Sequence, residues 1–191
     1  ITVMVGTIVG KEVGVWSSDK QSTGERKSTF QNMRYKVIVD TCYFLEHLKA
    51  GRSIRDIIES LSNNEAVSMV ILPLQVLDEL DNIISTRADV RGEICKAGLA
   101  LSSLKAEISY FRYCDQQEHC IGSSYKKVFV IDGLVTEEDI GSYGKLLQEH
   151  SKDGNKRVGT GEAAIFNILR CKLYEFYTDD KADDDRIVIL S

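Results

Sequence analysis

The sequence lacks the features of a disulfide-stabilised or membrane-spanning protein. Its five cysteines are an odd number and include no C-x-x-C pair, which argues against a disulfide framework and for a reducing compartment. No run of about 18 apolar residues is present, as a membrane-spanning helix would need. The first 16 residues have neither the basic region nor the small-residue cleavage site of a secretory signal. We therefore expect an intracellular protein, cytoplasmic or nuclear, that does not bind a membrane.

The chain also lacks an excess of positive charge. Its formal net charge is -5, from 24 Lys and Arg against 29 Asp and Glu, and phosphate contacts are made by Lys and Arg. The deficit is local, however, because five aspartates crowd residues 179–185. Basic residues cluster elsewhere, at Lys126, Lys127, Lys152, Lys156 and Arg157. The composition therefore leaves a nucleic-acid partner open.

The length of 191 residues and the hydrophobic content of 43% fit one domain with an extension. Residues 1–16 alternate apolar positions, which predicts a two-stranded β-ribbon. Residues 17–34 hold almost no large apolar side chains and read as a polar linker. We expect the compact domain to span residues 35–191.

Buried strands alternate with amphipathic helices along this domain, which predicts a three-layer α/β/α fold with a central parallel sheet. Helices are expected from Thr41 past Leu48, after Pro73, and over 54–61, 93–108, 137–150 and 162–172. Strands are expected at Tyr35–Val39, Val67–Leu72, Val128–Ile131, Glu175–Thr178 and Arg186–Leu190.

Carboxylates occur in four short segments where a predicted strand ends and a predicted helix begins. These segments are VIVDT (Asp40), ILPLQVLDEL (Glu79), GTGEAAIFNIL (Glu162) and FYTDD (Asp179, Asp180). An α/β sheet presents groups from the carboxyl ends of its strands to one crevice, so these acids can converge. Packed like charges repel unless a cation lies between them. Oxygen ligands suit Mg2+ or Mn2+ better than Zn2+.

Each acid also has a simpler explanation. Asp40 can cap the following helix, and Glu79 can be a solvated residue of an amphipathic helix. Glu162 can complement the macrodipole of its helix, and the run from Asp179 can be a charged surface turn. Four such coincidences at four junctions are less expected than one shared site, and the conjunction favours a metal centre.

The ordered segments VIVDT, ILPLQVLDEL, GTGEAAI and FYTDD resemble the PIN-domain ribonucleases over residues 35–191, and ILPLQVLDELDNI is closest to the eukaryotic RNA-surveillance and RNA-processing branches. The resemblance implies that four carboxylates bind one or two divalent ions, with Thr41 as an orienting hydroxyl and Asp179 as an outer acid. Those four are Asp40, Glu79, Glu162 and Asp180. The family usually has Asn or Ser where Cys42 stands, and a longer segment than KADDD before the last strand.

The activity implied by the resemblance is metal-dependent endoribonuclease cleavage of single-stranded RNA, in which the ion activates water and no protein nucleophile is needed. Basic residues before Glu162 are candidates to hold the RNA backbone. Residues 1–34 are candidates for protein contacts, and a homodimer is compatible with the sequence. The RNA-binding candidates are Lys152, Lys156 and Arg157, with Arg87 and Arg91 as secondary ones.

Other readings stay open. A catalytically inactive PIN-like scaffold that binds RNA or protein is the main alternative. A phosphohydrolase of the haloacid-dehalogenase type needs a second Asp two residues after Asp40, where Cys42 stands. We interpret Cys42 as a packed, inert thiol. The group Cys114, His119 and Cys120 matches no standard zinc module, so free thiols are the preferred reading.

Replacing Lys152, Lys156 and Arg157 together by Ala is expected to weaken RNA binding and to flatten its salt dependence. Each lost phosphate contact removes roughly 0.7 from the log–log slope for single strands. A binding titration at several salt concentrations measures that slope. An unchanged slope means that these side chains do not contact the RNA backbone.

Overall fold

A parallel five-stranded sheet forms the centre of the computed structural model, which describes residues 4–5, 34–114, 125–150, 159–177 and 186–191. The strand order is β1-β5-β2-β3-β4, and each neighbouring pair is parallel. All carboxyl ends of the strands therefore lie at one edge of the sheet. The strands are β1 (Met4–Val5), β2 (Tyr35–Val39), β3 (Val67–Pro73), β4 (Val128–Ile131) and β5 (Arg186–Leu190).

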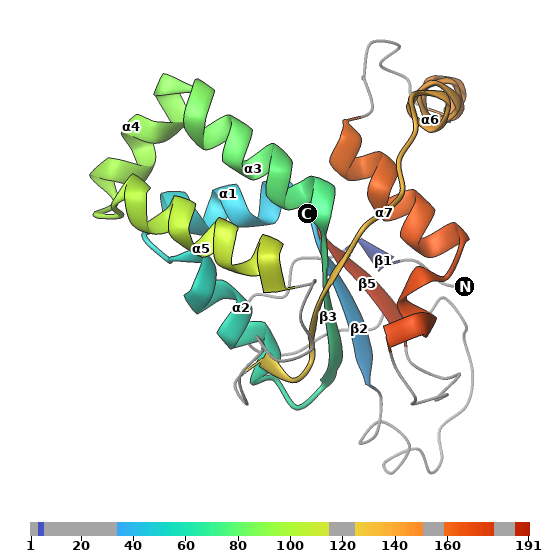
Figure 1. Ribbon diagram of the computed structural model, residues 1–191, viewed down its shortest axis with the longest axis horizontal. Coiled ribbons are helices and arrows are strands. Elements are labelled where there is room, and N and C mark those ends of the chain that lie inside the picture. Colours follow the sequence, from blue (N-terminus) through green and yellow to red (C-terminus); the bar gives the residue numbers. More distant parts are fainter. Residues whose placement is uncertain (1–3, 6–33, 115–124, 151–158, 178–185) are drawn as a thin grey trace, which may run out of the picture.

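Helices cover both faces of this sheet, so the expected three-layer α/β/α fold is confirmed (Figure 1). One layer holds α1 (Thr41–Lys49), α2 (Ile54–Ser62), α3 (Leu74–Thr86), α4 (Ala88–Lys96) and α5 (Leu101–Cys114). The other holds α7 (Thr160–Arg170) and the 3-10 turn η2 (Leu173–Tyr177), with α6 (Glu137–His150) packed on α7.

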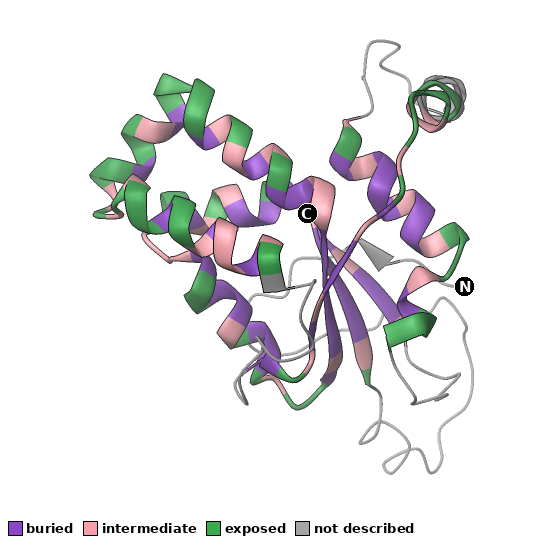
Figure 2. Ribbon diagram, viewed as in Figure 1, coloured by how far each residue is buried: buried purple, intermediate pink, exposed green. Residues whose placement is uncertain are grey.

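Successive side chains of each strand point to opposite faces of the sheet, so the core consists of two apolar clusters, one on each face. In β2, Val37 and Val39 pack under α1 to α5, whereas Ile38 packs under α7. In β5, Val188 faces the first cluster and Ile187 the second. Figure 2 shows the resulting burial along the central strands. Burial on both faces explains why the strands read as continuous apolar runs in the sequence.

The expected strand at Glu175–Thr178 is wrong as far as the structure describes it, because Leu173–Tyr177 forms a 3-10 turn. Lys172 adopts a positive φ of 50° and ends α7, and the Glu175 N–H donates to the Lys172 carbonyl at 2.9 Å. These local hydrogen bonds replace a strand ladder. Thr178 lies outside the described residues.

The expectation of one helix over residues 93–108 is also wrong, because this region contains two helices, α4 and α5, with a turn between them. Gly98 has φ +88°, and its N–H donates to the Cys95 carbonyl at 3.0 Å. A glycine in the left-handed region is a common helix terminator. The break produces two separate helices, and both α4 and α5 pack against α3.

Of the ribbon expected over residues 1–16, the structure describes only Met4–Val5. This strand pairs with β5, at the edge of the central sheet. The rest of that segment, including any second strand of a ribbon, lies outside the described residues. In the described parts of the chain, no helix has the length and apolar character that crossing a membrane requires.

Two glycines provide a matched test of the α4–α5 corner. A Cβ on Gly92, inside α4, or on Gly98 meets nothing within 4 Å. Gly92→Ala is expected to stabilise the fold by about 0.5–1 kcal/mol because alanine has the higher helix propensity. Gly98→Ala is expected to destabilise it by about 1–2 kcal/mol because of its left-handed backbone. Urea unfolding of both variants measures the change in the free energy of unfolding. Changes of the same sign in the two variants contradict the left-handed turn at Gly98 between α4 and α5.

Candidate functional site

Asp40 is the first residue after β2, at the carboxyl edge of the sheet. Its N–H donates to the Leu190 carbonyl at the end of β5, at 2.9 Å, which fixes the backbone between two central strands. The residue occupies the N-cap position of α1, yet its side chain makes no capping hydrogen bond. The backbone N–H groups of Thr41 and Cys42 in the first turn of α1 nevertheless favour its ionised form, and the carboxylate is only half-buried.

Glu79 comes from α3, which begins directly after Pro73 at the end of β3. Val76, Leu77 and Leu80 are buried on this helix, and Glu79 lies beside that apolar stripe. The Thr41 hydroxyl donates to Glu79 Oε2 at 2.9 Å. Because Thr41 follows Asp40, this hydrogen bond joins the start of α1 to α3 at the edge of the sheet.

The first turn of α7 brings Glu162 to the same place. A Cβ on Gly161 would lie 2.6 Å from Glu79 Oε2 and 3.2 Å from Val76 Cγ2. A side chain at position 161 would require the Glu79 carboxylate to shift, so glycine favours the approach of the α7 backbone to α3. Glu162 Oε2 accepts the Gly159 N–H at 3.3 Å, and a Cβ on Gly159 would lie 3.5 Å from Glu79 Oε1. Glu162 therefore starts its helix within the same small region as Glu79.

Burial and mutual repulsion raise the pKa values of two of these carboxyl groups. Burial is the main cause for Asp40; the N–H groups of Thr41 and Cys42 partly offset it, and the Glu162 charge adds to it. For Glu79, burial is again the main cause, the Thr41 hydrogen bond opposes it, and Asp40 and Glu162 add to it. Among the described residues, no basic side chain contributes to lowering either pKa. Negative charge is thus concentrated around Asp40 and Glu79.

Cys42 is exposed, so the interpretation of it as a packed thiol is wrong. Partial burial raises the pKa of its thiol, and the charges of Asp40, Glu79 and Glu162 raise it further. A thiol held in its neutral form is a poor nucleophile and a poor metal ligand. Partial burial first, and the neighbouring negative charges second, raise the pKa of Cys42 and favour its neutral form. The cysteines described with their side chains, namely Cys42, Cys95 and Cys171, are all free.

Carboxylate oxygens are the donors that hard divalent cations prefer, and the negative charge of Glu162 acts on both Asp40 and Glu79. As positioned, the described residues include no group of three or more His, Cys, Asp or Glu side chains that could hold an ion together. Asp179 and Asp180, which the resemblance adds to the site, lie outside the described residues.

The expected RNA-binding residues are not gathered at this site in the described chain. Arg87 follows the end of α3, eight residues or roughly 12 Å of helix from Glu79, and forms an ion pair with Asp89 at 2.5 Å. Arg91 donates to the Ser85 carbonyl. Both arginines therefore have local partners at the far end of α3. Lys152, Lys156 and Arg157 lie outside the described residues, as do His119, Cys120 and the side chain of Cys114.

Two polar residues beside the site were not anticipated from the sequence. Asp132 follows β4, just as Asp40 follows β2, and Gln75 Nε2 donates to Asp132 Oδ1 at 2.6 Å. The segment VFVID carried the same signal as VIVD, a carboxylate directly after a buried strand. Gln75 had no such signal, because its role depends on a loop 57 residues later.

Comparisons of the chain with protein-family models, with curated proteins and with solved structures find no match.

Replacing Glu79 by Gln is expected to raise the melting temperature in EDTA at pH 7. The glutamine keeps an acceptor for Thr41 and removes one of the repelling charges. Since the folded-state pKa of Glu79 is raised, the folded protein binds more protons than the unfolded chain. Its ionisation therefore costs stability as pH rises from the unfolded-state pKa through the folded-state pKa.

The difference between wild type and Glu79→Gln is accordingly expected to vanish at acidic pH, where Glu79 is protonated in both states. Thermal melts between pH 3 and about 7.5 cover this range. Glu65→Gln, at an exposed position of the α2–β3 turn, is the matched control and should melt as wild type at pH 7. A lower melting temperature for Glu79→Gln at pH 7 contradicts the repulsion.

Proposed function

We propose that this protein is a divalent-metal-dependent endoribonuclease, similar to the PIN-domain ribonucleases, that hydrolyses phosphodiester bonds in single-stranded RNA. The observation that carries the proposal is the mutual electrostatic influence of Asp40, Glu79 and Glu162 near the carboxyl edge of a parallel sheet. This edge is where open α/β sheets bind ligands. The ordered motifs that end in Asp180 support the same assignment.

The ligands for Mg2+ or Mn2+ in this proposal are Asp40, Glu79, Glu162 and Asp180, with Asp179 as an outer acid. Bound there, the ion supplies Lewis-acid stabilisation of the negative charge that develops on a phosphate undergoing hydrolysis. The carboxylates bind and orient the ion, and they cost stability without it because they repel.

Thr41 and two glycines at the start of α7, Gly159 and Gly161, influence the orientation of the Glu79 carboxylate. The Thr41 hydroxyl holds Glu79 Oε2 at 2.9 Å, so the other carboxylate oxygen, Oε1, is the one directed towards the turn at Gly159. A fixed orientation of each ligand is what a metal site needs for a defined coordination geometry. Cys42 stays protonated in this field and takes no part in the chemistry.

RNA binding requires positive charge next to this acidic centre. The proposal assigns that role to Lys152, Lys156 and Arg157, which precede α7 in the sequence. Arg87 and Arg91 would bind RNA only further along α3, because both engage partners at its far end. An RNA strand lying along α3 could contact both sets of basic residues.

Asp40→Asn is expected to abolish Mn2+-dependent cleavage of single-stranded RNA while leaving the protein folded. The substitution keeps the size of the side chain and removes the charge that binds the ion. A gel assay of labelled RNA with Mn2+ or with EDTA measures cleavage, and a thermal melt of the same preparation confirms folding. Without metal, the variant should melt at or above the wild-type temperature, because one repelling charge is lost.

Asp89→Asn provides the matched control, since Asp89 is an exposed aspartate whose partner is Arg87. It should cleave RNA as the wild type does. Cleavage by Asp40→Asn at the wild-type rate contradicts the proposed site. Wild-type protein that binds RNA but never cuts it with any divalent metal favours the inactive scaffold instead.

A further inference from the structure

The loop between β4 and α6 is fastened to α3 by one side chain, that of Gln75. Gln75 Nε2 donates to Asp132 Oδ1 at 2.6 Å, and Gln75 Oε1 accepts the Gly133 N–H at 3.1 Å. Asp132 Oδ1 also accepts the Leu134 N–H at 2.9 Å. The amide of Gln75 therefore uses its donor and its acceptor on two successive residues of the loop, which fixes both the position and the direction of that loop.

The same loop presses on α7 close to Glu162. A Cβ on Gly133 would lie 2.6 Å from both Cα and Cβ of Ala164 and 3.0 Å from its carbonyl oxygen. The Gly133 backbone thus packs directly on the helix backbone two residues after Glu162. A side chain at position 133 would separate the loop from α7.

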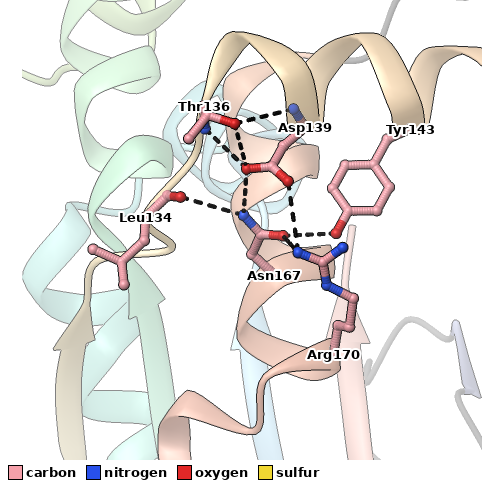
Figure 3. Close-up of polar contacts among 6 residues, drawn as sticks. All are labelled: Leu134, Thr136, Asp139, Tyr143, Asn167 and Arg170. Carbon is pink, nitrogen blue, oxygen red and sulfur yellow. Dashed lines mark hydrogen bonds and ion pairs between the residues drawn. The ribbon is translucent and has the colours of Figure 1, made fainter.

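A second tie lies one turn further along α7, at the buried Asn167 (Figure 3). Asn167 Nδ2 donates to the Leu134 carbonyl at 3.5 Å and to Asp139 Oδ2 at 3.3 Å, and its Oδ1 accepts the Tyr143 hydroxyl at 2.6 Å. Ala164 and Asn167 are three residues apart, so they share one face of the helix. The loop therefore runs along α7 from Ala164 to Asn167.

Gln75 and Glu79 are four residues apart on α3, so they also share one face. On that face, Glu79 meets the first turn of α7 at Gly161, whereas Gln75 holds the loop that packs on Ala164. The first two turns of α7 are consequently bounded by α3 on one side and by the loop on the other. Gln75 is the side chain that joins these two boundaries.

We propose that Gln75 is a positioning residue of the site: through Gly133 it holds the start of α7 so that Glu162 faces Asp40 and Glu79. The inference rests on the proposed function, because it concerns the same carboxylates. Gln75 does not touch the ion or the RNA. It acts by fixing the backbone that carries Glu162, in the way that residues behind a metal site fix its ligands.

An apolar residue of similar length cannot replace this amide. In Gln75→Met the volume is nearly kept, but the Gly133 N–H loses its acceptor and Asp132 loses a donor. The loop then keeps its hydrogen bond to Asn167 but loses its attachment to α3, which weakens its packing on Ala164. The expected result is a folded protein whose first α7 turn opens more often and whose Mn2+ affinity is lower by about tenfold or more, the usual effect of losing a residue that supports a metal ligand.

Two measurements test this on purified full-length protein. Amide hydrogen exchange at Ala163 and Ala164 reports opening of the first α7 turn, where the Ala163 N–H donates to the Gly159 carbonyl. Calorimetric titration with Mn2+ alone reports affinity without using activity. Asn82→Met is the matched control, because it removes an exposed amide from α3 seven residues away from Gln75. It should leave both measurements at wild-type values.

Faster exchange in the first α7 turn together with weaker Mn2+ binding, at a melting temperature that keeps the variant folded, supports the inference. Unchanged exchange, or unchanged Mn2+ affinity, overturns it. If Gln75→Met does not fold, the same two measurements are made on Gln75→Asn. This variant shortens the side chain by one methylene and so withdraws the amide from the loop. Wild-type protein that binds no Mn2+ contradicts the proposed function itself, whereas wild-type binding with an unaltered Gln75 variant contradicts only the inference.

Discussion

The close packing of α7 against α3 is the constraint on which the site depends. Gly161 lies within this contact, where a Cβ would lie 2.6 Å from Glu79 Oε2 and 3.2 Å from Val76 Cγ2. This contact brings a helix from one face of the sheet to a helix from the other face, past the carboxyl ends of β2 and β3. Without it, Glu162 would cap its own helix at a distance from Asp40 and Glu79. With it, three residues far apart in the sequence share one electrostatic environment.

That environment is unfavourable for the folded chain by itself. Burial and neighbouring negative charge raise the pKa values of Asp40 and Glu79, so their ionised forms destabilise the protein at neutral pH. A sequence selected for stability alone would have no reason to keep such an arrangement. Strained or repelling groups of this kind are characteristic of sites where a ligand supplies the missing interaction. A divalent cation is the ligand that we propose for this site.

Much of the fold could be predicted because the central strands are buried on both faces. Continuous apolar runs such as Val67–Leu72 have one reading in an α/β chain, and their order with intervening helices defines a parallel sheet. The failures lie where short-range hydrogen bonds decide the conformation. The segment after Lys172 has strand-like composition but forms a turn, because the positive φ of Lys172 allows a 3-10 hydrogen bond to Glu175. The corner at Gly98 required the left-handed conformation of one residue, which helical periodicity does not reveal.

The candidate site was predictable to the extent that the position of a residue on a strand or helix determines where its side chain points. Asp40 was identified because it follows a strand, Glu79 because it flanks the apolar stripe of the helix after β3, and Glu162 because it lies in the first turn of a helix. Asp132 carried the same signal and was overlooked. Gln75 and Asn167 carried none, because each acts through partners on a distant loop. The exposure of Cys42 was also missed, since the apolar residues around it in the sequence belong to the buried side of α1.

Anomalous diffraction from crystals of the metal-loaded protein tests the central claim most directly. With Mn2+ added, we expect an anomalous peak about 2.1 Å from carboxylate oxygens of Asp40 and of at least one of Glu79 and Glu162, the bond length usual for a small hard cation on oxygen. Those side chains should turn towards the ion while the Thr41 hydrogen bond to Glu79 is kept. Well-ordered carboxylates with no ion between them, at a Mn2+ concentration that saturates binding elsewhere on the protein, would contradict the account.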